Sequence, residues 1–555
     1  MNKTALIMEC SENIRTYLKK INHSYNEIYL LCLEEKDISN LLLEFNNIKV
    51  IYLKLDRNLR EKIAQQAYSY INSLASAEEK LDNFISEYGS FINYFKYKYI
   101  FDYIKSNYDI TQFIIEDKIL NKNMIYNLNR NYNIKTLSTS FNIRALVKDI
   151  IDYLNKRRYK VFIYPSIIYS KLFYGISNPS ISSNTQKNVL VNASFHVNFA
   201  RVLLPFESIL SEKGYNIYYL AKTKKVADYL KKRTKQKIIC IAELIRWKDL
   251  LNKRLKILDL NTANKDVKSF FSFYKSKFYE YEIYYSAIEK LFSNNKFDLV
   301  LSGDDVEPFG RYVIKTANKY KIRTINVQHG YIADKFNYGS TISNIMFTWD
   351  GISTDIINKI KKTNTKLITV GPPHLNNKSF SNSIIIKDPN DVIISWFPSP
   401  NLYTGTSELN RMISYIVESS INSFSENNNL ILLIKLHPFD SIKIYKNALK
   451  SIKPLKNIKI TLYQNNINPI EILLKSDIVI AMNTSVVYEA KLSCVPIIAF
   501  NPFQEELNEL LCPYYDKIIV SQEDLEYYFK HNSIIKRKTK NPKVNFDWNL
   551  VNNVI

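Results

Sequence analysis

The feature that most constrains the fold is an alternation, along almost the whole chain, of short apolar runs with stretches of helical periodicity. Short apolar runs bounded by turn residues are typical of buried strands. Strands that alternate with helices favour a parallel sheet covered on both faces. The runs are TALIME, EIYLLCL, IKVIYL, QFIIED and NIKTLST before residue 150; NVLVNAS, GYNIYYLA, KIICIAE, FDLVLSGDD, RTINVQHG, NIMFTWD and KLITVGPPH between 188 and 380; and DVIISWF, LILLIKLHP, IKITLY, SDIVIA, VPIIAF and KIIV after 380. We therefore predict an α/β fold built from Rossmann-like units.

A chain of 555 residues is too long for a single core. We predict an N-terminal Rossmann-like α/β domain in 1–150, a linker in 151–187 containing the run GISNPSISSNTQ, two further α/β domains in 188–380 and 381–530, and a basic tail in 531–555. The order of elements in 1–145 resembles that in 188–330. A duplication and two unrelated Rossmann-like units explain this equally well.

The net charge of +23 indicates an anionic partner, which could be nucleic acid, anionic lipid or an acidic polysaccharide. The aromatic and basic run FFSFYKSKFYEYEIYY favours a helix with an aromatic core face over nucleic-acid binding. The five cysteines lack the paired spacing of zinc sites or disulfides. No apolar run reaches the roughly 18 residues that span a bilayer, and the N-terminus lacks the pattern of a signal peptide. We therefore expect a cytoplasmic protein.

The run LILLIKLHP reads as a buried strand that ends in a basic tip. Lys435 lies two residues before His437, so both side chains point to the same face of the strand, and Pro438 stiffens the exit. We interpret this tip as one half of a phosphate-binding site.

The second half is predicted where the strand SDIVIA turns into the helix VVYEAKL. The turn Asn483, Thr484 and Ser485 offers backbone N–H groups and two hydroxyls beyond the end of the strand, where anions bind well. Glu489 lies about one helical turn further on and could accept hydrogen bonds from a ribose. Together these residues outline a nucleotide-binding site without the Gly-rich loop of a dinucleotide fold.

Four of the six histidines follow a predicted strand directly: His196, His329, His374 and His437. Ligands of open α/β sheets bind at the carboxyl ends of the strands, so this placement indicates a cleft. Gln328 and Gly330 flank His329, and Gly330 would let a ligand approach the backbone closely. His196 and His374 could equally serve local structure.

Asp304 and Asp305 follow the strand FDLVLS. A carboxylate at a strand end could remove the proton of an acceptor hydroxyl, and acidic neighbours would raise its pKa. Alternatively, either residue could cap the helix that follows. We place both, with His329, in a predicted catalytic group.

The motifs RTINVQHG, LIKLHP and NTSVVYEA, each after a strand and in this order, resemble those of bacterial GT-B glycosyltransferases of surface-polysaccharide synthesis. The resemblance is to the capsule-synthesis group with its Kdo transferases and to the sialyl- and polysialyltransferases. It covers roughly residues 188–520. It implies a GT-B-like fold of two facing Rossmann-like domains, with an additional N-terminal α/β region. It also implies that the domain at 188–380 binds the acceptor and that the domain at 381–530 binds the nucleotide-sugar donor.

The resemblance further implies donor contacts from His437 and Pro438, phosphate contacts from Thr484 and Ser485, catalysis without a bound metal, and no resident cofactor. In the sialyltransferases the base lies in an acidic pair followed by glycine, whereas here Gly303 precedes the two aspartates. We expect a transferase that moves a CMP-activated acidic sugar onto capsule or lipooligosaccharide, acting at the inner face of the cytoplasmic membrane. The alternatives are a CDP-glycerol glycerophosphotransferase, a UDP-N-acetylglucosamine 2-epimerase and a non-catalytic GT-B scaffold.

Overall fold

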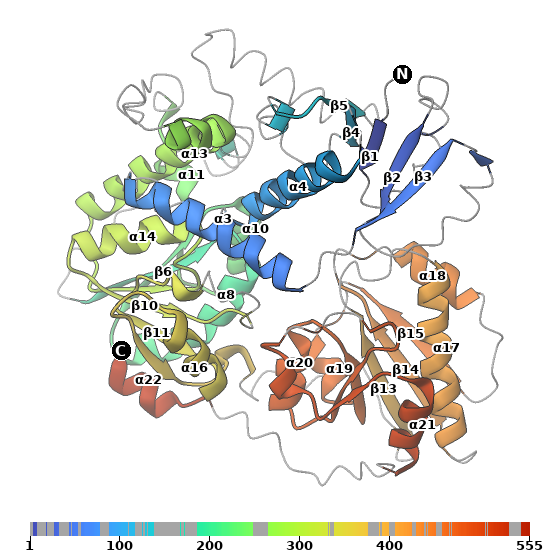
Figure 1. Cartoon of the computed structure of the whole chain (residues 1–555). Helices are drawn as coiled ribbons and strands as arrows, with labels where there is room; N and C mark the ends of the chain where they lie inside the picture. The colour runs from blue at the N-terminus through green and yellow to red at the C-terminus, as the bar shows by residue number, and fades with distance from the viewer. Residues whose placement is uncertain are drawn as a thin grey trace. The chain divides into compact units, whose positions relative to one another are not determined.

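The computed structural model contains three sheets and their flanking helices (Figure 1). The described residues are 4–7, 18, 27–32, 44–45, 47–53, 57–77, 88–108, 110, 112–116, 125, 128–129, 131–137, 167, 171–172, 186–247, 265–330, 332, 338–375, 388, 391–398, 406–424, 429–437, 440, 442–450, 458–464, 467, 469–504, 507, 509–531 and 546–555. Most of the predicted linker and Pro438 lie outside them.

The N-terminal sheet has five parallel strands in the order β3-β2-β1-β4-β5. The strands are β1 (Thr4–Ile7), β2 (Ile28–Cys32), β3 (Ile48–Tyr52), β4 (Gln112–Glu116) and β5 (Ile134–Leu137). Two long helices, α3 (Arg57–Ala77) and α4 (Tyr88–Asn107), lie between β3 and β4 in the chain and contact each other.

The second sheet has seven strands in the order β12-β11-β10-β9-β6-β7-β8. The strands are β6 (Asn188–Ser194), β7 (Asn216–Ala221), β8 (Lys237–Cys240), β9 (Leu299–Ser302), β10 (Arg323–Val327), β11 (Ile345–Thr348) and β12 (Lys366–Thr369). Its helices are α8 (Val197–Leu203), α9 (Glu207–Glu212), α10 (Lys224–Lys231), α11 (Ile241–Leu244), α13 (Lys265–Asn294), α14 (Pro308–Lys319) and α16 (Gly351–Ile360). Every residue of β6 is buried, as expected for a central strand covered on both faces.

The third sheet has six parallel strands in the order β15-β14-β13-β16-β17-β18. The strands are β13 (Asp391–Phe397), β14 (Asn429–Lys435), β15 (Ile458–Tyr463), β16 (Ile478–Ala481), β17 (Ile497–Phe500) and β18 (Lys517–Ile519). Its helices are α17 (Thr406–Ser423), α18 (Ile442–Lys450), α19 (Pro469–Leu473), α20 (Val486–Leu492) and α21 (Gln522–His531). The predicted α/β class with two Rossmann-like sheets and an additional N-terminal α/β region is confirmed.

The same connection order recurs in all three sheets. The first strand of each pairs with the second on one side and the fourth on the other, as β1, β6 and β13 show. This is the common strand order of Rossmann-like sheets, so it suits a duplication and two unrelated units alike.

The N-terminal helices contribute to the core of the seven-stranded sheet. Ala67 and Tyr68 of α3 and Phe91 of α4 belong to the same buried cluster as Leu190 of β6 and Val300 of β9. The Tyr68 hydroxyl also lies 3.3 Å from the Ser340 hydroxyl oxygen. These two helices therefore contribute to the core of the seven-stranded sheet as well as to the N-terminal region.

The chain divides into two compact units. The first is Met1–Val327 with Phe336–Met346 and Ile357–Leu367, and the second is Gln328–Lys335 with Phe347–Ile356 and Ile368–Ile555. The chain ends in helix α22 (Trp548–Val554), and the Asp547 N–H before this helix donates to the Val370 carbonyl oxygen. Residues 532–545 of the predicted basic tail lie outside the described residues.

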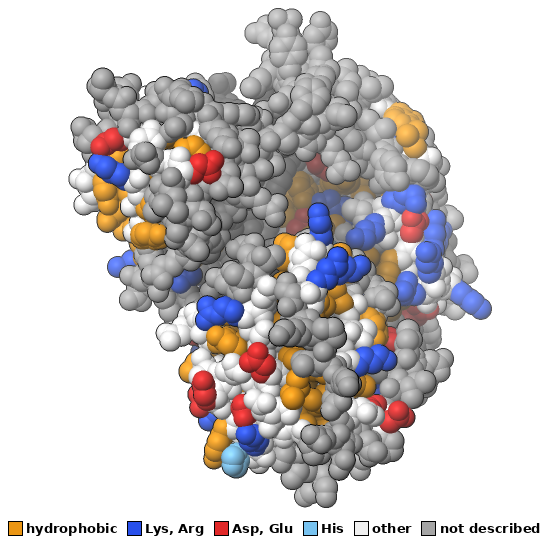
Figure 2. Space-filling model, turned by 90° about the vertical axis from the view of Figure 1, so that its right-hand side faces the viewer, with side chains coloured by type: hydrophobic (Ala, Val, Ile, Leu, Met, Phe, Trp, Pro, Cys, Tyr) orange, Lys and Arg blue, Asp and Glu red, His pale blue; other side chains and the backbone are white. Residues whose placement is uncertain are grey.

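Charged side chains are mixed on the face shown in Figure 2, where Lys and Arg lie among acidic and apolar side chains. Within the described parts of the chain, no helix is both long and apolar enough to cross a membrane.

Candidate functional site

Both Rossmann-like sheets place predicted site residues where the strand order reverses. In the seven-stranded sheet this point lies between β6 and β9, which pair in parallel as Asn192 with Ser302. In the six-stranded sheet it lies between β13 and β16, which pair as Phe397 with Ala481. Crevices beyond the carboxyl ends of strands at such a switch point are where open α/β sheets bind ligands.

Asp304 is held in a tight turn just beyond β9. Its Oδ1 accepts hydrogen bonds from the backbone N–H groups of Val306 at 3.1 Å and Glu307 at 3.2 Å. Its Oδ2 is buried without a hydrogen-bond partner among the described residues. Burial, followed by the charge of Glu307, raises the pKa of Asp304 to about 8. Asp304 is therefore a carboxyl group whose pKa lies much closer to neutral pH than the ordinary pKa of an aspartate.

Asp305 is also buried, but donors surround its carboxylate. Oδ2 accepts hydrogen bonds from the Thr341 hydroxyl at 2.5 Å, the Ser343 hydroxyl at 2.8 Å and the backbone N–H groups of Ile342 and Ser343. Oδ1 accepts from Asn326 at 2.8 Å. The role of catalytic base predicted for Asp305 does not fit these contacts, which instead fix the loop before β11.

A polar cluster that was not predicted lies beside Asp304. Glu307 caps α14 through Oε2, while its Oε1 accepts a 2.5 Å hydrogen bond from the Tyr281 hydroxyl. The ammonium of Lys222, the first residue after β7, lies 3.3 Å from the same oxygen. The capping role considered for the aspartates thus belongs to Glu307. A lysine directly after a strand was the one sequence signal that could have indicated the cluster.

His196 lies at the same edge and is exposed. Its Nδ1 accepts the backbone N–H of Asn198 at 3.2 Å, so His196 caps α8. Burial, with the charges of Lys225 and Arg201, lowers the pKa of His196. Because Nδ1 accepts this hydrogen bond, it carries no proton.

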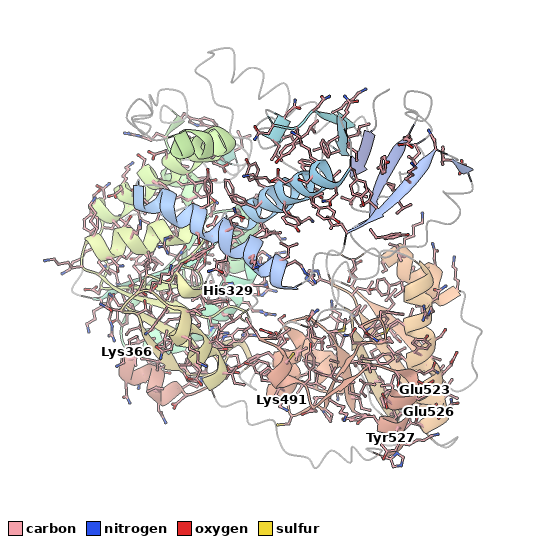
Figure 3. The ribbon with its side chains drawn as sticks, viewed as in Figure 1. His329, Lys366, Lys491, Glu523, Glu526 and Tyr527 are labelled. Carbon is pink, nitrogen blue, oxygen red and sulfur yellow. The ribbon has the colours of Figure 1, made fainter. Side chains whose placement is uncertain are left out.

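Gln328 connects the ends of β10 and β11. Its Oε1 accepts the Trp349 backbone N–H at 2.9 Å, and its Nε2 donates to the Gly330 carbonyl oxygen at 2.8 Å and the Ser353 hydroxyl at 3.3 Å. His329, labelled in Figure 3, is half-buried in the turn between Gln328 and Gly330. A β-carbon on Gly330 would meet no atom of the described residues within 4 Å.

Lys435 and His437 lie at the carboxyl end of β14, as predicted. The Lys435 ammonium is buried and donates to the carbonyl oxygens of Leu436 and Gln464. These contacts anchor the strand end, and the phosphate-binding role predicted for Lys435 does not fit them. The backbone N–H of His437 donates to Asp440 at 2.9 Å, and burial lowers the pKa of the half-buried imidazole.

The turn after β16 has the predicted form. Asn483 adopts a positive φ of 52°, and its backbone N–H donates to the Tyr515 hydroxyl at 3.1 Å. Ser485 begins α20 without capping it through its side chain. Asn483, Thr484 and Ser485 are all half-buried. The turn therefore holds two hydroxyl-bearing residues at the switch point of this sheet.

Glu489 and His374 form a buried pair, although they were predicted for different groups. Glu489 Oε1 lies 3.7 Å from His374 Nε2. The imidazole ring lies 5.2 Å from the Trp349 ring, which in turn lies 5.1 Å from Tyr488. Glu489 therefore faces an aromatic cluster, and the ribose contact predicted for it is not supported by its burial.

The described residues contain no group of three or more His, Cys, Asp and Glu side chains arranged to hold a metal ion. Cys240, the cysteine that is fully buried, has its pKa raised to about 11 by burial, which makes it an unreactive thiol.

No protein-family model and no curated protein matches the sequence. The structure is similar to a UDP-GlcNAc 2-epimerase from Methanocaldococcus jannaschii, at 16% identity over 65% of this chain and 95% of that chain, with a TM-score of 0.44. It is also similar to CalG4, the calicheamicin glycosyltransferase, at 13% identity over 65% and 94% of the two chains, with a TM-score of 0.41. A third similar structure is MurG from Acinetobacter baumannii, at 12% identity over 66% and 99% of the two chains, with a TM-score of 0.38.

Proposed function

We propose that this chain is a glycosyltransferase that uses a nucleotide-sugar donor. The observation that carries the proposal is the carboxyl edge of the six-stranded sheet, where His437 lies two residues beyond β14 and Asn483, Thr484 and Ser485 follow β16 at the switch point. An imidazole and a turn with two hydroxyls suit a phosphate at this position.

The proposed donor is a CMP-activated acidic sugar of the Kdo or sialic-acid type. Its support is the net charge of +23 and the order of the three motifs that resemble surface-polysaccharide transferases. In the reaction, the bond between the sugar and the nucleotide phosphate breaks while the acceptor hydroxyl attacks the sugar carbon. His437 and the hydroxyls of Thr484 and Ser485 stabilise the charge that develops on the departing phosphate.

Asp304 is the proposed base that takes the proton of the acceptor hydroxyl. Its raised pKa suits a group that both accepts and releases a proton near neutral pH. Asp305 is left out of this role because five hydrogen bonds already saturate its carboxylate. The reaction needs no metal in this proposal, because hydrogen-bond donors stabilise the leaving phosphate.

The proposed acceptor is a bacterial surface glycan such as capsule or lipooligosaccharide, reached at the inner face of the cytoplasmic membrane. The basic composition supports peripheral contact with anionic lipid.

A second candidate is a UDP-N-acetylglucosamine 2-epimerase. The switch-point site of the six-stranded sheet would suit the diphosphate of a UDP-sugar in the same way, and Asp304 could remove a proton from the sugar carbon. The nucleotide that binds separates the two candidates.

The test is calorimetric titration of the purified chain with CMP, CDP and UDP. His437→Ala is compared with His531→Ala, a matched change of an exposed histidine on α21. We expect CMP to bind most tightly, His437→Ala to weaken binding and lower turnover by about 10²- to 10³-fold, and His531→Ala to change neither.

Preference for UDP would favour the epimerase, and preference for CDP a glycerophosphotransferase. Absence of nucleotide binding would favour the alternative of a non-catalytic GT-B scaffold. A folded His437→Ala protein with unchanged binding and turnover would remove this site from the proposal.

A further inference from the structure

The position of the Asp304 carboxyl group depends on the backbone of Glu307. The Glu307 N–H donates to Asp304 Oδ1 at 3.2 Å, and the Val306 N–H donates to the same oxygen at 3.1 Å. Ser302 closes the turn from the other side, because its hydroxyl donates to the Asp304 carbonyl oxygen at 2.6 Å. A displacement of Glu307 would therefore displace the Asp304 carboxyl group.

Glu307 makes more contacts than the cap of a helix requires. One oxygen is enough for a cap, and Oε2 fills this role by accepting the Phe309 N–H at 2.9 Å. The other oxygen, Oε1, accepts a 2.5 Å hydrogen bond from the Tyr281 hydroxyl of α13 and lies 3.3 Å from the Lys222 ammonium after β7. Glu307 therefore links α13, α14 and the end of β7.

Lys222 is itself fixed by aromatic rings. Its ammonium lies 4.3 Å from the ring centre of Tyr281, and the ring centres of Tyr284, Phe195 and Phe309 follow at 5.3, 5.6 and 5.8 Å. It also donates to the Tyr281 hydroxyl at 2.8 Å. Because aromatic faces attract a cation, these rings hold the ammonium beside Glu307.

Charged and titratable side chains lie on the elements around the turn of Asp304. They are Asp305 in the same turn, Glu307 and Arg311 on α14, Lys222 after β7, Tyr281 and Tyr285 on α13, and His196 after β6. Burial contributes most to the raised pKa of Asp304, and the charge of Glu307 comes next. Glu307 therefore acts on Asp304 both through a hydrogen bond and through its charge.

We propose that Glu307 and Lys222 are positioning residues for Asp304, the proposed base. The pair holds the turn that carries the Asp304 carboxyl group and keeps a charge beside that group. In the proposed reaction, the proton of the acceptor hydroxyl moves to the Asp304 carboxylate while the acceptor oxygen bonds to the sugar and the nucleotide phosphate departs. Glu307 and Lys222 act through Asp304 and not on the substrate. Their part in the reaction rests on the proposed function, whereas their effect on Asp304 does not.

The effect on Asp304 is tested without substrate, through the difference in melting temperature between each chain and the same chain carrying Asp304→Asn. In the original background this difference grows as pH rises, because the folded protein holds a proton that the unfolded chain releases. It stops growing near the pKa of Asp304, at about pH 8, which is the end point of the titration. Glu307→Gln removes the neighbouring negative charge and should lower the end point by about one pH unit. Lys222→Met removes the countercharge of Glu307 and should raise it.

A second cluster of the same composition provides matched controls. Glu289 on α13 accepts a hydrogen bond from the Tyr312 hydroxyl at 3.1 Å and lies 3.4 Å from the Lys319 ammonium, and both of these partners are on α14. Glu289 follows Tyr281 on the same helix and lies about 12 Å further along it. Glu289→Gln and Lys319→Met should therefore leave the end point near pH 8.

An unchanged end point in a folded Glu307→Gln protein, or equal shifts in the control variants, would overturn the proposal. So would shifts of the same sign in Glu307→Gln and Lys222→Met, because a general loosening of the fold would move both in one direction.

Turnover on the same variants separates this proposal from the previous one. It is measured as CMP release from CMP-sialic acid, with an α2,8-linked sialic acid tetramer as the acceptor. The rise of turnover with pH should shift in the same directions as the end points. If the end points shift while turnover is absent or keeps its pH profile, the proposed role of Asp304 in transfer is wrong and its positioning by Glu307 stands.

Discussion

A β-carbon on Gly310 would lie 2.8 Å from Oδ2 of Asp304 and 2.5 Å from the Asp304 carbonyl oxygen. The first turn of α14 and the acidic turn after β9 are therefore in direct contact, and only glycine allows it. This contact helps to hold the Asp304 carboxyl group in its buried position.

We predict that Gly310→Ala destabilises the protein by about 1–3 kcal/mol, because the added methyl group must displace the backbone of the acidic turn. The measurement is the midpoint of thermal or urea unfolding. Gly351→Ala is the matched control, since a β-carbon there meets nothing within 4 Å. An equal effect of the two substitutions would show that the contact is not tight.

Asp304→Asn should change how stability depends on pH. Burial raises the pKa of Asp304 to about 8, so folding favours the protonated carboxyl group. The stability that the protonated Asp304 contributes is fully present below the ordinary pKa of an aspartate. It is lost as pH rises through about 8. The variant, which resembles the protonated form, should match the original chain near pH 4 and be more stable than it near pH 8.5. Parallel curves of melting temperature against pH would contradict the raised pKa.

The substitutions Tyr488→Phe and Tyr514→Phe should have different effects on the free energy of unfolding. The buried Tyr488 hydroxyl has no hydrogen-bond partner among the described residues, so its removal should be neutral or stabilising. The Tyr514 hydroxyl donates to Asp350 at 2.7 Å, so its removal should destabilise by about 1.5–3 kcal/mol. Both rings pack against each other at 5.3 Å, so unfolding midpoints compare two hydroxyls in one environment. If Tyr488→Phe lowered stability as much as Tyr514→Phe does, the Tyr488 hydroxyl would have to make a hydrogen bond, and the prediction would be wrong.

The strands were predictable because each is a short apolar run of its own. The runs NVLVNAS, DVIISWF and SDIVIA, for example, appear as β6, β13 and β16. A strand of a parallel sheet is buried on both faces, so its own few residues must be almost all apolar. A short segment of sequence is therefore enough to predict it. The positions of candidate residues at strand ends follow from the same pattern.

The roles of those residues were less predictable, because they depend on contacts between distant parts of the chain. Four of the five hydrogen bonds to Asp305 come from residues 341–343, and the carbonyl oxygen of Gln464 helps to hold the Lys435 ammonium. Glu307 has the capping role that was considered for the two aspartates. No local pattern distinguishes a carboxylate that fixes a loop from one that faces a substrate.

The side chains of Ala67, Tyr68 and Phe91 fill a cluster that β6 and β9 cannot close alone. Removal of the N-terminal region would therefore uncover part of this cluster. A homologous protein without this region must cover the same face of the seven-stranded sheet with other side chains. Changes in α3 and α4 should therefore be inherited together with changes in the core of that sheet, which links the ancestry of the two regions more tightly than their separation in the sequence indicates.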